Sequence, residues 1–197
     1  DRVFFVLNAR AIKFGGWLKG YDVFKPNNIA YIDSAGNFIR SRDGAAGLGD
    51  GSIVEMNSSE KFYGQGKLSF RVLDNLKFWY QFIYDKVDAR DFNSFYVLNP
   101  NGATGSHRIG QTHLAQETHV LSNSTFYTVG VSLFEKDYRS YVYEDINDPR
   151  YVHPNLLLQL TPYSYSTGGT DMRHFNRTTT SLVGKADFTS QITQQHL

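Results

Sequence analysis

Three side chains that bind transition metals lie close together in the stretch QTHLAQETHVL, at residues 111–121: His113, Glu117 and His119. Imidazole nitrogens and a carboxylate are ligands for zinc and iron. Their spacings of four and two residues are even, which would place all three on one face of a strand. A lone strand closes poorly around a metal ion, and the same residues suit a polar strand face. We therefore predict no metal site and no cofactor here.

The acidic stretch YEDINDP contains four residues whose oxygens could bind calcium: Glu144, Asp145, Asn147 and Asp148. It lacks the glycine and the bidentate glutamate of an EF-hand loop, and a proline occupies a ligand position. We interpret it as an acidic turn. The glycine-rich segment at residues 41–52 lacks the Lys-Ser/Thr of a phosphate-binding loop, which favours a plain connecting loop.

Tyrosines are frequent between residues 137 and 171, and their rings could stack on a sugar or an aromatic ligand. They could equally form an aromatic girdle at a membrane interface, and both interpretations stay open. The sequence contains no nucleophile elbow, paired-carboxylate signature or HExxH motif, so we predict that the protein is not an enzyme. The candidate ligand-binding residues are Tyr138, Tyr141, Tyr143, Tyr151, Tyr163 and Tyr165.

A β-hairpin between Lys61 and Tyr84 organises the elements that must position these residues. In KFYGQGKLSFRV and LKFWYQFIY, apolar and polar residues alternate, which predicts two strands with unlike faces. Asp74-Asn75 marks the turn. We expect Val72 opposite Leu76 and Phe70 opposite Phe78. The same register places Arg71 opposite Lys77, which is a like-charge pair. The polar side chains predicted to face a barrel lumen are Tyr63, Gln65, Lys67, Arg71, Trp79 and Gln81.

Further strands are predicted at residues 3–12, 111–121, 125–135 and 173–189, with a seventh strand beginning after residue 194. The phase of residues 111–121 is ambiguous. A turn at residues 123–124 would place Val120 opposite Tyr127, which directs His113, Glu117 and His119 inward. It would direct outward the side chains of Leu114, Gln116, Thr118 and Val120. The other phase would place Glu117 on an apolar face at a higher free-energy cost.

The connections alternate in length. Residues 13–58, 86–110 and 137–172 are long connections, whereas 73–75, 122–124 and 190–194 are short. Long loops on one rim and tight turns on the other are typical of an up-and-down outer-membrane barrel. We therefore predict an all-β, antiparallel, up-and-down transmembrane β-barrel segment, about six to seven strands of a larger barrel with long extracellular loops.

The composition excludes several protein classes. The 197 residues carry a net charge of only +1, so no strong field points to nucleic acid. The chain contains no cysteine, which excludes disulfides and thiolate metal sites. Its longest apolar run, Val3 to Leu7, is far shorter than the roughly 20 residues of a transmembrane helix. The 15 Phe and 13 Tyr suit strands and interfacial girdles.

Several segments resemble barrel segments of TonB-dependent outer-membrane receptors. They are STFYTVGVSLFEKDYRSYVYEDINDPRYVHP, YSTGGTDMRHFNR, GDGSIVEMNSSEKFYGQGKLSF and FYVLNPNG, and the resemblance is strongest over residues 50–197. It implies a barrel of about 22 strands with an N-terminal plug. It also implies binding and import of a scarce nutrient, such as a siderophore, vitamin or glycan, across the bacterial outer membrane.

On this interpretation residues 1–197 are part of the barrel domain, and both chain ends lie within a longer protein. The plug and the remaining strands lie outside the chain. The expected partners are outer-membrane lipid, the nutrient and the inner-membrane TonB energy-coupling complex, which the missing N-terminal part would contact. No ligand-binding residue is transferred from the family, because the loops vary with the ligand. Alternative functions are a soluble β-sandwich that binds a ligand or carbohydrate, or a passive porin or adhesin barrel.

Overall fold

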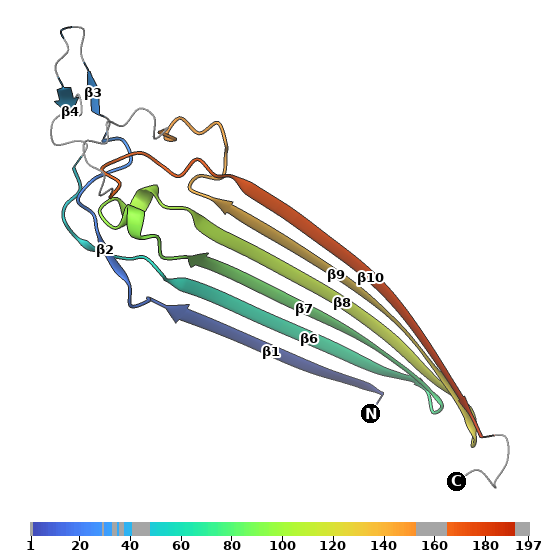
Figure 1. Ribbon diagram of the computed structural model, residues 1–197. Coiled ribbons are helices and arrows are strands. Elements are labelled where there is room, and N and C mark those ends of the chain that lie inside the picture. The colour runs from blue at the N-terminus through green and yellow to red at the C-terminus, as the bar shows by residue number, and fades with distance from the viewer. Residues whose placement is uncertain are drawn as a thin grey trace.

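Six long strands form one antiparallel sheet in a computed structural model that describes residues 2–28, 30–32, 35, 38–40, 48–152 and 165–191. The strands are hydrogen-bonded in chain order, β1-β6-β7-β8-β9-β10, and lie side by side (Figure 1). The predicted all-β, antiparallel, up-and-down arrangement is therefore confirmed. The six strands are β1 (Val3–Phe14), β6 (Ser59–Leu73), β7 (Leu76–Arg90), β8 (Gly105–Ser122), β9 (Thr125–Tyr141) and β10 (Phe175–Ser190).

The remaining elements are short and lie in the long connections. Strand β2 (Lys19–Tyr21) pairs with β5 (Ile53–Glu55), and β3 (Ala30–Ile32) pairs with β4 (Phe38–Arg40). Two 3-10 turns, η2 (Ser94–Tyr96) and η3 (Pro100–Gly102), are the helical elements of the described residues.

The two ends of the sheet differ as the loop lengths predict. Short turns at residues 74–75 and 123–124 lie at one rim, and the long connections lie at the other (Figure 1). The last residue of β10, Ser190, pairs with Thr125, so β10 also ends at the short-turn rim. Residues 192–197, which include most of the third predicted turn and the seventh strand, lie outside the described residues.

The strands extend further towards the long connections than the sequence indicates. Residues 86–90 and 105–110 were predicted as loop but belong to β7 and β8, and residues 137–141 belong to β9. In this region of β7 charged side chains occupy the face that is apolar elsewhere, and Val87 and Ala89 lie on the other, so the alternation changes phase although the pairing continues. Cross-strand polar contacts accompany the extensions, such as the Lys13–Glu60 ion pair and the contact of His107 Nδ1 with Asp88 Oδ1.

The hairpin of β6 and β7 has the predicted register over most of its length. Phe70 lies opposite Phe78, with ring centroids 6.4 Å apart, and Arg71 lies opposite Lys77. The pairing expected at the turn is wrong. A register shift after Arg71 brings Leu73, and not Val72, opposite Leu76, which leaves a tighter connection of two residues.

The phase proposed for residues 111–121 is also wrong. Val120 pairs with Phe126 and His119 pairs with Tyr127, because the ladder shifts between Val120 and Ser122. As a result His113, Glu117 and His119 share a face with Phe82, Phe78 and Leu76 of β7. The residues predicted to point with these phenylalanines lie instead beside Gln81, Trp79 and Lys77: Leu114, Gln116 and Thr118.

Paired residues of neighbouring strands point to the same side, so the register defines two faces. We call one the apolar face; it includes Val3, Phe5, Leu7, Leu68, Phe70, Phe78, Tyr80, Phe82, Val129, Val131, Leu133 and Leu182. We call the other the polar face, and it includes all six side chains predicted to face a lumen: Tyr63, Gln65, Lys67, Arg71, Trp79 and Gln81. That this face meets a lumen stays a prediction.

Neither face is packed against a second layer in the part of the chain that the structure describes. On the apolar face Leu7 is 82% exposed, Phe5 77% and Leu182 72%. The buried hydrophobic residues lie in the long connections: Met56, Tyr96, Ala103 and Val152. The sheet itself is therefore a single layer with apolar side chains on its surface.

Candidate functional site

Three long connections fold together over one rim of the sheet into a unit that we call the loop cap: residues 15–28, 48–58, 91–104, 142–152 and 165–174. Backbone hydrogen bonds join its segments, including Tyr21 N to Val97 O at 2.7 Å and Asp171 N to Gly102 O at 2.8 Å. A third bond, from Gly169 N to Pro26 O, measures 2.7 Å. These bonds connect parts of the chain more than 60 residues apart, so the cap is one folded structure.

A small core stabilises the loop cap. Met56, Tyr96 and Ala103 are buried together, and burial raises the pKa of the Tyr96 hydroxyl to about 12. Asn99 is fully buried and donates from Nδ2 to Ser166 Oγ at 3.0 Å and to Gly169 O at 2.9 Å. Buried polar groups must find such partners, so Asn99 fixes the 165–174 segment against the 91–104 segment.

The Thr170 hydroxyl gives a direct test of this cohesion. It accepts a hydrogen bond from Val152 N at 3.0 Å and is fully buried. Thr170→Val keeps the shape of the side chain but leaves the Val152 N–H without a partner. We therefore expect the free energy of unfolding of the cap to fall by about 1–2 kcal/mol. Faster hydrogen exchange of the Val152 amide measures the loss. Thr170→Ser keeps the hydroxyl and should exchange at nearly the original rate; equal rates in both variants would contradict the assignment.

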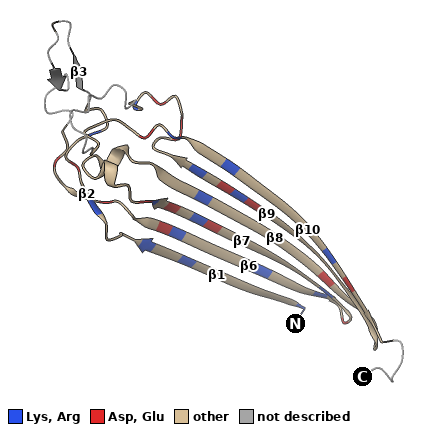
Figure 2. Ribbon diagram, viewed as in Figure 1, with Lys and Arg blue, Asp and Glu red and all other residues tan. Residues whose placement is uncertain are grey.

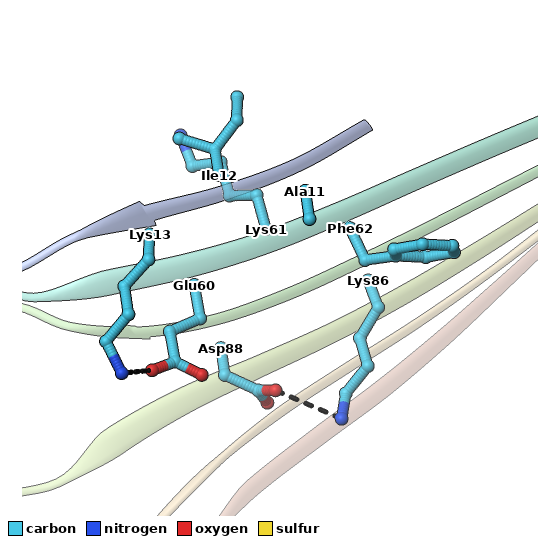
Figure 3. A pocket seen from close by; sticks show the side chains of 8 residues that line it. All are labelled: Ala11, Ile12, Lys13, Glu60, Lys61, Phe62, Lys86 and Asp88. Carbon is cyan, nitrogen blue, oxygen red and sulfur yellow. Dashed lines mark ion pairs between the residues drawn. The ribbon is translucent and has the colours of Figure 1, made fainter. Parts of the chain in front are cut away.

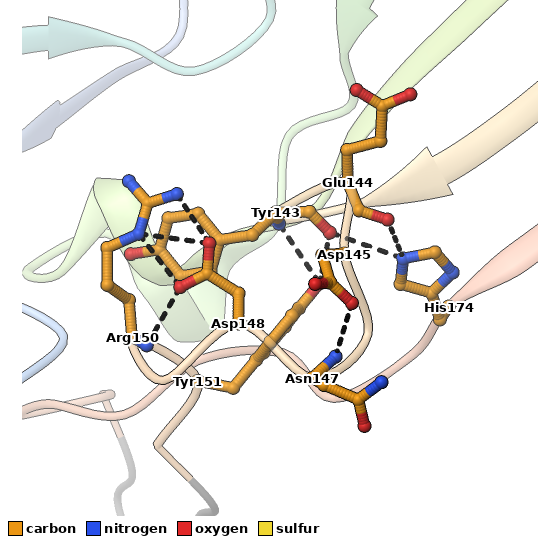
Figure 4. A network of polar contacts seen from close by, with 8 residues as sticks. All are labelled: Tyr143, Glu144, Asp145, Asn147, Asp148, Arg150, Tyr151 and His174. Carbon is orange, nitrogen blue, oxygen red and sulfur yellow. Dashed lines mark hydrogen bonds and ion pairs between the residues drawn. The ribbon is translucent and has the colours of Figure 1, made fainter.

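The acidic turn is closed by its own ion pairs (Figure 4). Arg150 Nη2 lies 2.6 Å from Asp148 Oδ2, and the guanidinium lies 4.0 Å from the centroid of the Tyr143 ring. Hydrogen bonds from Arg150 lower the pKa of Asp148 to about 2. Asp145 accepts from Asn147 N, and Glu144 pairs with Arg139. Across the described residues, no three His, Asp or Glu side chains are grouped to hold one metal ion.

The structure does not gather the five described candidate tyrosines into one site. Tyr138 and Tyr141 belong to β9 and point to opposite faces. The Tyr141 ring stacks on His107, with centroids 4.6 Å apart, and on His174 at 5.4 Å. Tyr165 is 54% exposed, and Tyr163 lies outside the described residues.

Tyr143 and Tyr151 form a separate pair within the loop cap. Tyr151 donates from its hydroxyl to Tyr143 O at 2.7 Å and accepts from Tyr143 N at 3.0 Å (Figure 4). His174 Nε2 lies 3.2 Å from the same Tyr143 carbonyl. These two tyrosines therefore stabilise the cap. Binding of a ligand by any of the six stays a prediction.

A pocket of about 730 Å³ lies where the polar face meets the loop cap. Its charged residues are Asp91, Asp171 and Arg173. Arg173 is joined to Asp171 by Nη2–Oδ2 and Nε–Oδ1 contacts of 2.6 and 3.0 Å. Burial opposes ionisation of Asp171, but hydrogen bonds from Arg173 outweigh it and lower the pKa of the carboxyl. The Arg173 side chain is 76% exposed. The pocket also includes Phe92, Asn93, Ser94, Tyr138 and Phe175.

Sequence reasoning missed this pocket, although its tyrosine, Tyr138, was among the candidates. Asp171 and Arg173 stand two residues apart in a region without alternation, and that spacing has no specific meaning before the fold is known. Their position above the polar face depends on β10, which begins at Phe175 and leads the segment back onto the sheet.

Charged residues border the apolar face next to the loop cap. Lys13 pairs with Glu60, Lys86 with Asp88 at 3.1 Å, and His107 with Asp88 at 2.7 Å. Figure 3 shows the four ionic side chains of Lys13, Glu60, Lys86 and Asp88 on one side of the sheet. Ile12 and Lys61 point to the other side (Figure 3). Apolar side chains therefore give way to ion pairs along a sharp border.

Polar side chains interrupt the apolar face on β8, and tyrosines from the neighbouring strands contact three of them, His113, Glu117 and His119. The Tyr80 hydroxyl lies 2.7 Å from His113 Nδ1. The Tyr127 hydroxyl donates to Glu117 at 2.8 Å and lies 3.2 Å from His119 Nδ1. These contacts give each of the three side chains a hydrogen-bond partner within the sheet.

Comparisons of this chain with protein-family models, curated proteins and solved structures found no match. Among the described residues, none of the helical turns is long and apolar enough to cross a membrane.

Proposed function

We propose that this chain is part of the β-barrel of an outer-membrane receptor of the TonB-dependent type that its segments resemble. The receptor captures a scarce nutrient at its long connections and imports it with energy from an inner-membrane TonB complex. The observation that carries this proposal is the band of apolar side chains on one face of a single-layer sheet.

The band has the height expected for a lipid-facing surface. On β1 it extends from Val3 to Ala11, and on β6 from Phe70 to Phe62. Nine residues extend about 27 Å along a strand, and a tilt of about 40° reduces this to about 21 Å. Lipid-facing bands of outer-membrane barrels are about 25 Å tall. Ion pairs end the band on the cap side, where lipid headgroups would lie.

The border of the band is oblique to the strands. On β1 the apolar residue nearest the loop cap is Ala11. On β10 it is Leu182, which is in register with Leu7 of β1. The border therefore moves four residues, about 14 Å, across five strand spacings of about 4.8 Å, which gives a tilt of about 30°. Strands in outer-membrane barrels tilt by about 35–45°. A membrane plane explains an oblique border directly.

The unpaired outer edges of β1 and β10 favour a sheet that continues beyond these six strands. Within the described residues, β1 pairs only with β6 and β10 pairs only with β9. A long unpaired strand edge is a site of aggregation, and barrel closure removes it. A soluble sandwich would instead need a second layer over the apolar face, and the described residues supply none. We therefore favour the barrel, with the 730 Å³ pocket as its outer ligand contact.

Quenching of fluorophores tests the membrane assignment. Labels would replace Leu68 and Val131 on the apolar face, and Lys67 and Ser132 on the polar face, in the full-length receptor in lipid bilayers. We expect lipid-soluble quenchers to reach positions 68 and 131, and water-soluble quenchers to reach 67 and 132. If neither quencher reaches 68 and 131, that face is packed against protein and the membrane assignment is wrong.

A further inference from the structure

We infer that the polar face binds an anionic solute, with phosphate or carboxylate groups, at a site formed by Arg10, Lys61 and Arg108. The inference rests on the proposed function and specifies the class of nutrient that the receptor takes up.

The two faces of the sheet differ strongly in charge, although the whole chain is almost neutral. The polar face has two carboxylates, Asp85 and Asp187, and nine basic side chains. The apolar face has four basic side chains against five carboxylates. Figure 2 shows basic positions distributed along the strands. The nine basic residues of the polar face are Arg10, Lys61, Lys67, Arg71, Lys77, Arg108, Lys136, Arg177 and Lys185.

Most of these cations have no carboxylate partner in the described structure. Lys185 pairs with Asp187 at 2.8 Å, but Arg108 Nε is 3.9 Å from Asp85 Oδ2, too far for a hydrogen bond. Lys67 lies 4.4 Å from the centroid of the Trp79 ring. By contrast, the cations beside the loop cap on the apolar face, Lys13 and Lys86, are each paired.

A pocket of about 440 Å³ on the polar face brings three of the cations together. Arg10 of β1 is opposite Tyr63, which is opposite Asp85 on β7. Lys61 stands two residues from Tyr63, and its row leads through Val87 to Arg108 on β8. Three strand spacings separate β1 from β8, so the cations lie within about 15 Å. Asp85 is the one carboxylate in the pocket lining.

The chemistry of the pocket selects an anion. Three cations share a single carboxylate, Asp85, which lies 3.9 Å from Arg108, so the pocket has an excess of positive charge that a bound anion would offset. Two of them are arginines, whose planar guanidinium groups bind phosphate and carboxylate through paired N–H donors. A neutral sugar would gain nothing from the excess charge, and a metal cation would be repelled.

The test measures binding of two probe anions, pyrophosphate and citrate, to the full-length receptor in detergent by titration calorimetry. We expect saturable binding of at least one, weakening as salt is added. The double variant Arg10→Gln/Arg108→Gln should bind at least about tenfold more weakly, since it removes both guanidinium groups. Preference for one probe distinguishes a phosphate ligand from a carboxylate ligand.

The matched control is Lys13→Gln/Lys86→Gln, which removes the same charge from the other face and should leave binding unchanged. No saturable binding of either anion, or an equal loss in both double variants, would overturn the inference. Quenching of labels at positions 68 and 131 is repeated in the Arg10→Gln/Arg108→Gln variant. Correct insertion without anion binding would refute this inference alone, whereas failure of the quenching pattern would refute the proposed function.

Discussion

Val131→Arg is expected to destabilise the folded protein in a lipid bilayer by about 2–4 kcal/mol. Val131 lies near the centre of the apolar run on β9, opposite Ala115 and Gly184, and is 48% exposed. If hydrocarbon surrounds this face, an arginine there must lose much of its hydration. Unfolding by urea from phospholipid vesicles measures the difference in free energy.

The control is Ser132→Arg, at the adjacent position on the polar face, where Ser132 is opposite Leu114 and Val183. An arginine there would stay hydrated, so the control should cost much less than Val131→Arg. Equal costs would contradict the assignment of the two faces. A soluble sandwich would also reject an arginine in its core, and for that reason the unfolding measurement is read together with the quenching pattern.

Local alternation was enough to predict the hairpin of β6 and β7. Phe70, Phe78 and their neighbours alternate with polar residues, and a short turn leaves few registers, so the pairing follows from the sequence. The alternation changes phase at Lys86 and Asp88, where charged side chains occupy the face that is apolar elsewhere. The backbone ladder continues there, pairing Glu60 with Asp88, and this pairing is recognisable only after the register is known.

The phase of β8 depended on an interaction that is not local. Glu117 on an apolar face looked too costly, because its partner could not be identified from β8 alone. That partner is the hydroxyl of Tyr127 on the neighbouring strand β9, which donates to Glu117 at 2.8 Å. The shift between Val120 and Ser122, accompanied by a bond from Val120 N to Asn75 O at 2.9 Å, then sets the register.

The loop cap was not predictable for a related reason. Its contacts join residues far apart in the chain, such as Asn28 Nδ2 and Thr167 O at 2.6 Å. The core of the cap consists of Met56, Tyr96 and Ala103, which no periodic pattern marks. The same limit applies to the three cations of the 440 Å³ pocket. Arg10, Lys61 and Arg108 line one pocket only because four strands are paired in the correct register.

Tyr80→Phe is expected to destabilise the protein in bilayers by about 1–3 kcal/mol, because it leaves His113 Nδ1 without its hydroxyl partner. The two atoms are 2.7 Å apart. His113 lies within the apolar band, opposite Phe82 and Leu133, and its ring centroid is 4.9 Å from that of Phe82. Urea unfolding from vesicles again gives the free energy.

Tyr84→Phe is the matched control on the same strand and face, since the Tyr84 hydroxyl makes no hydrogen bond to the described residues; it should cost little. A double-mutant cycle then isolates the pair. In a His113→Leu background no imidazole needs a partner, so Tyr80→Phe should lose most of its effect. An equal cost in both backgrounds would mean that the Tyr80 hydroxyl does not act through His113. If Tyr80→Phe costs nothing in either background, water reaches His113. The centre of the apolar band would then be wet, and lipid could not be its solvent.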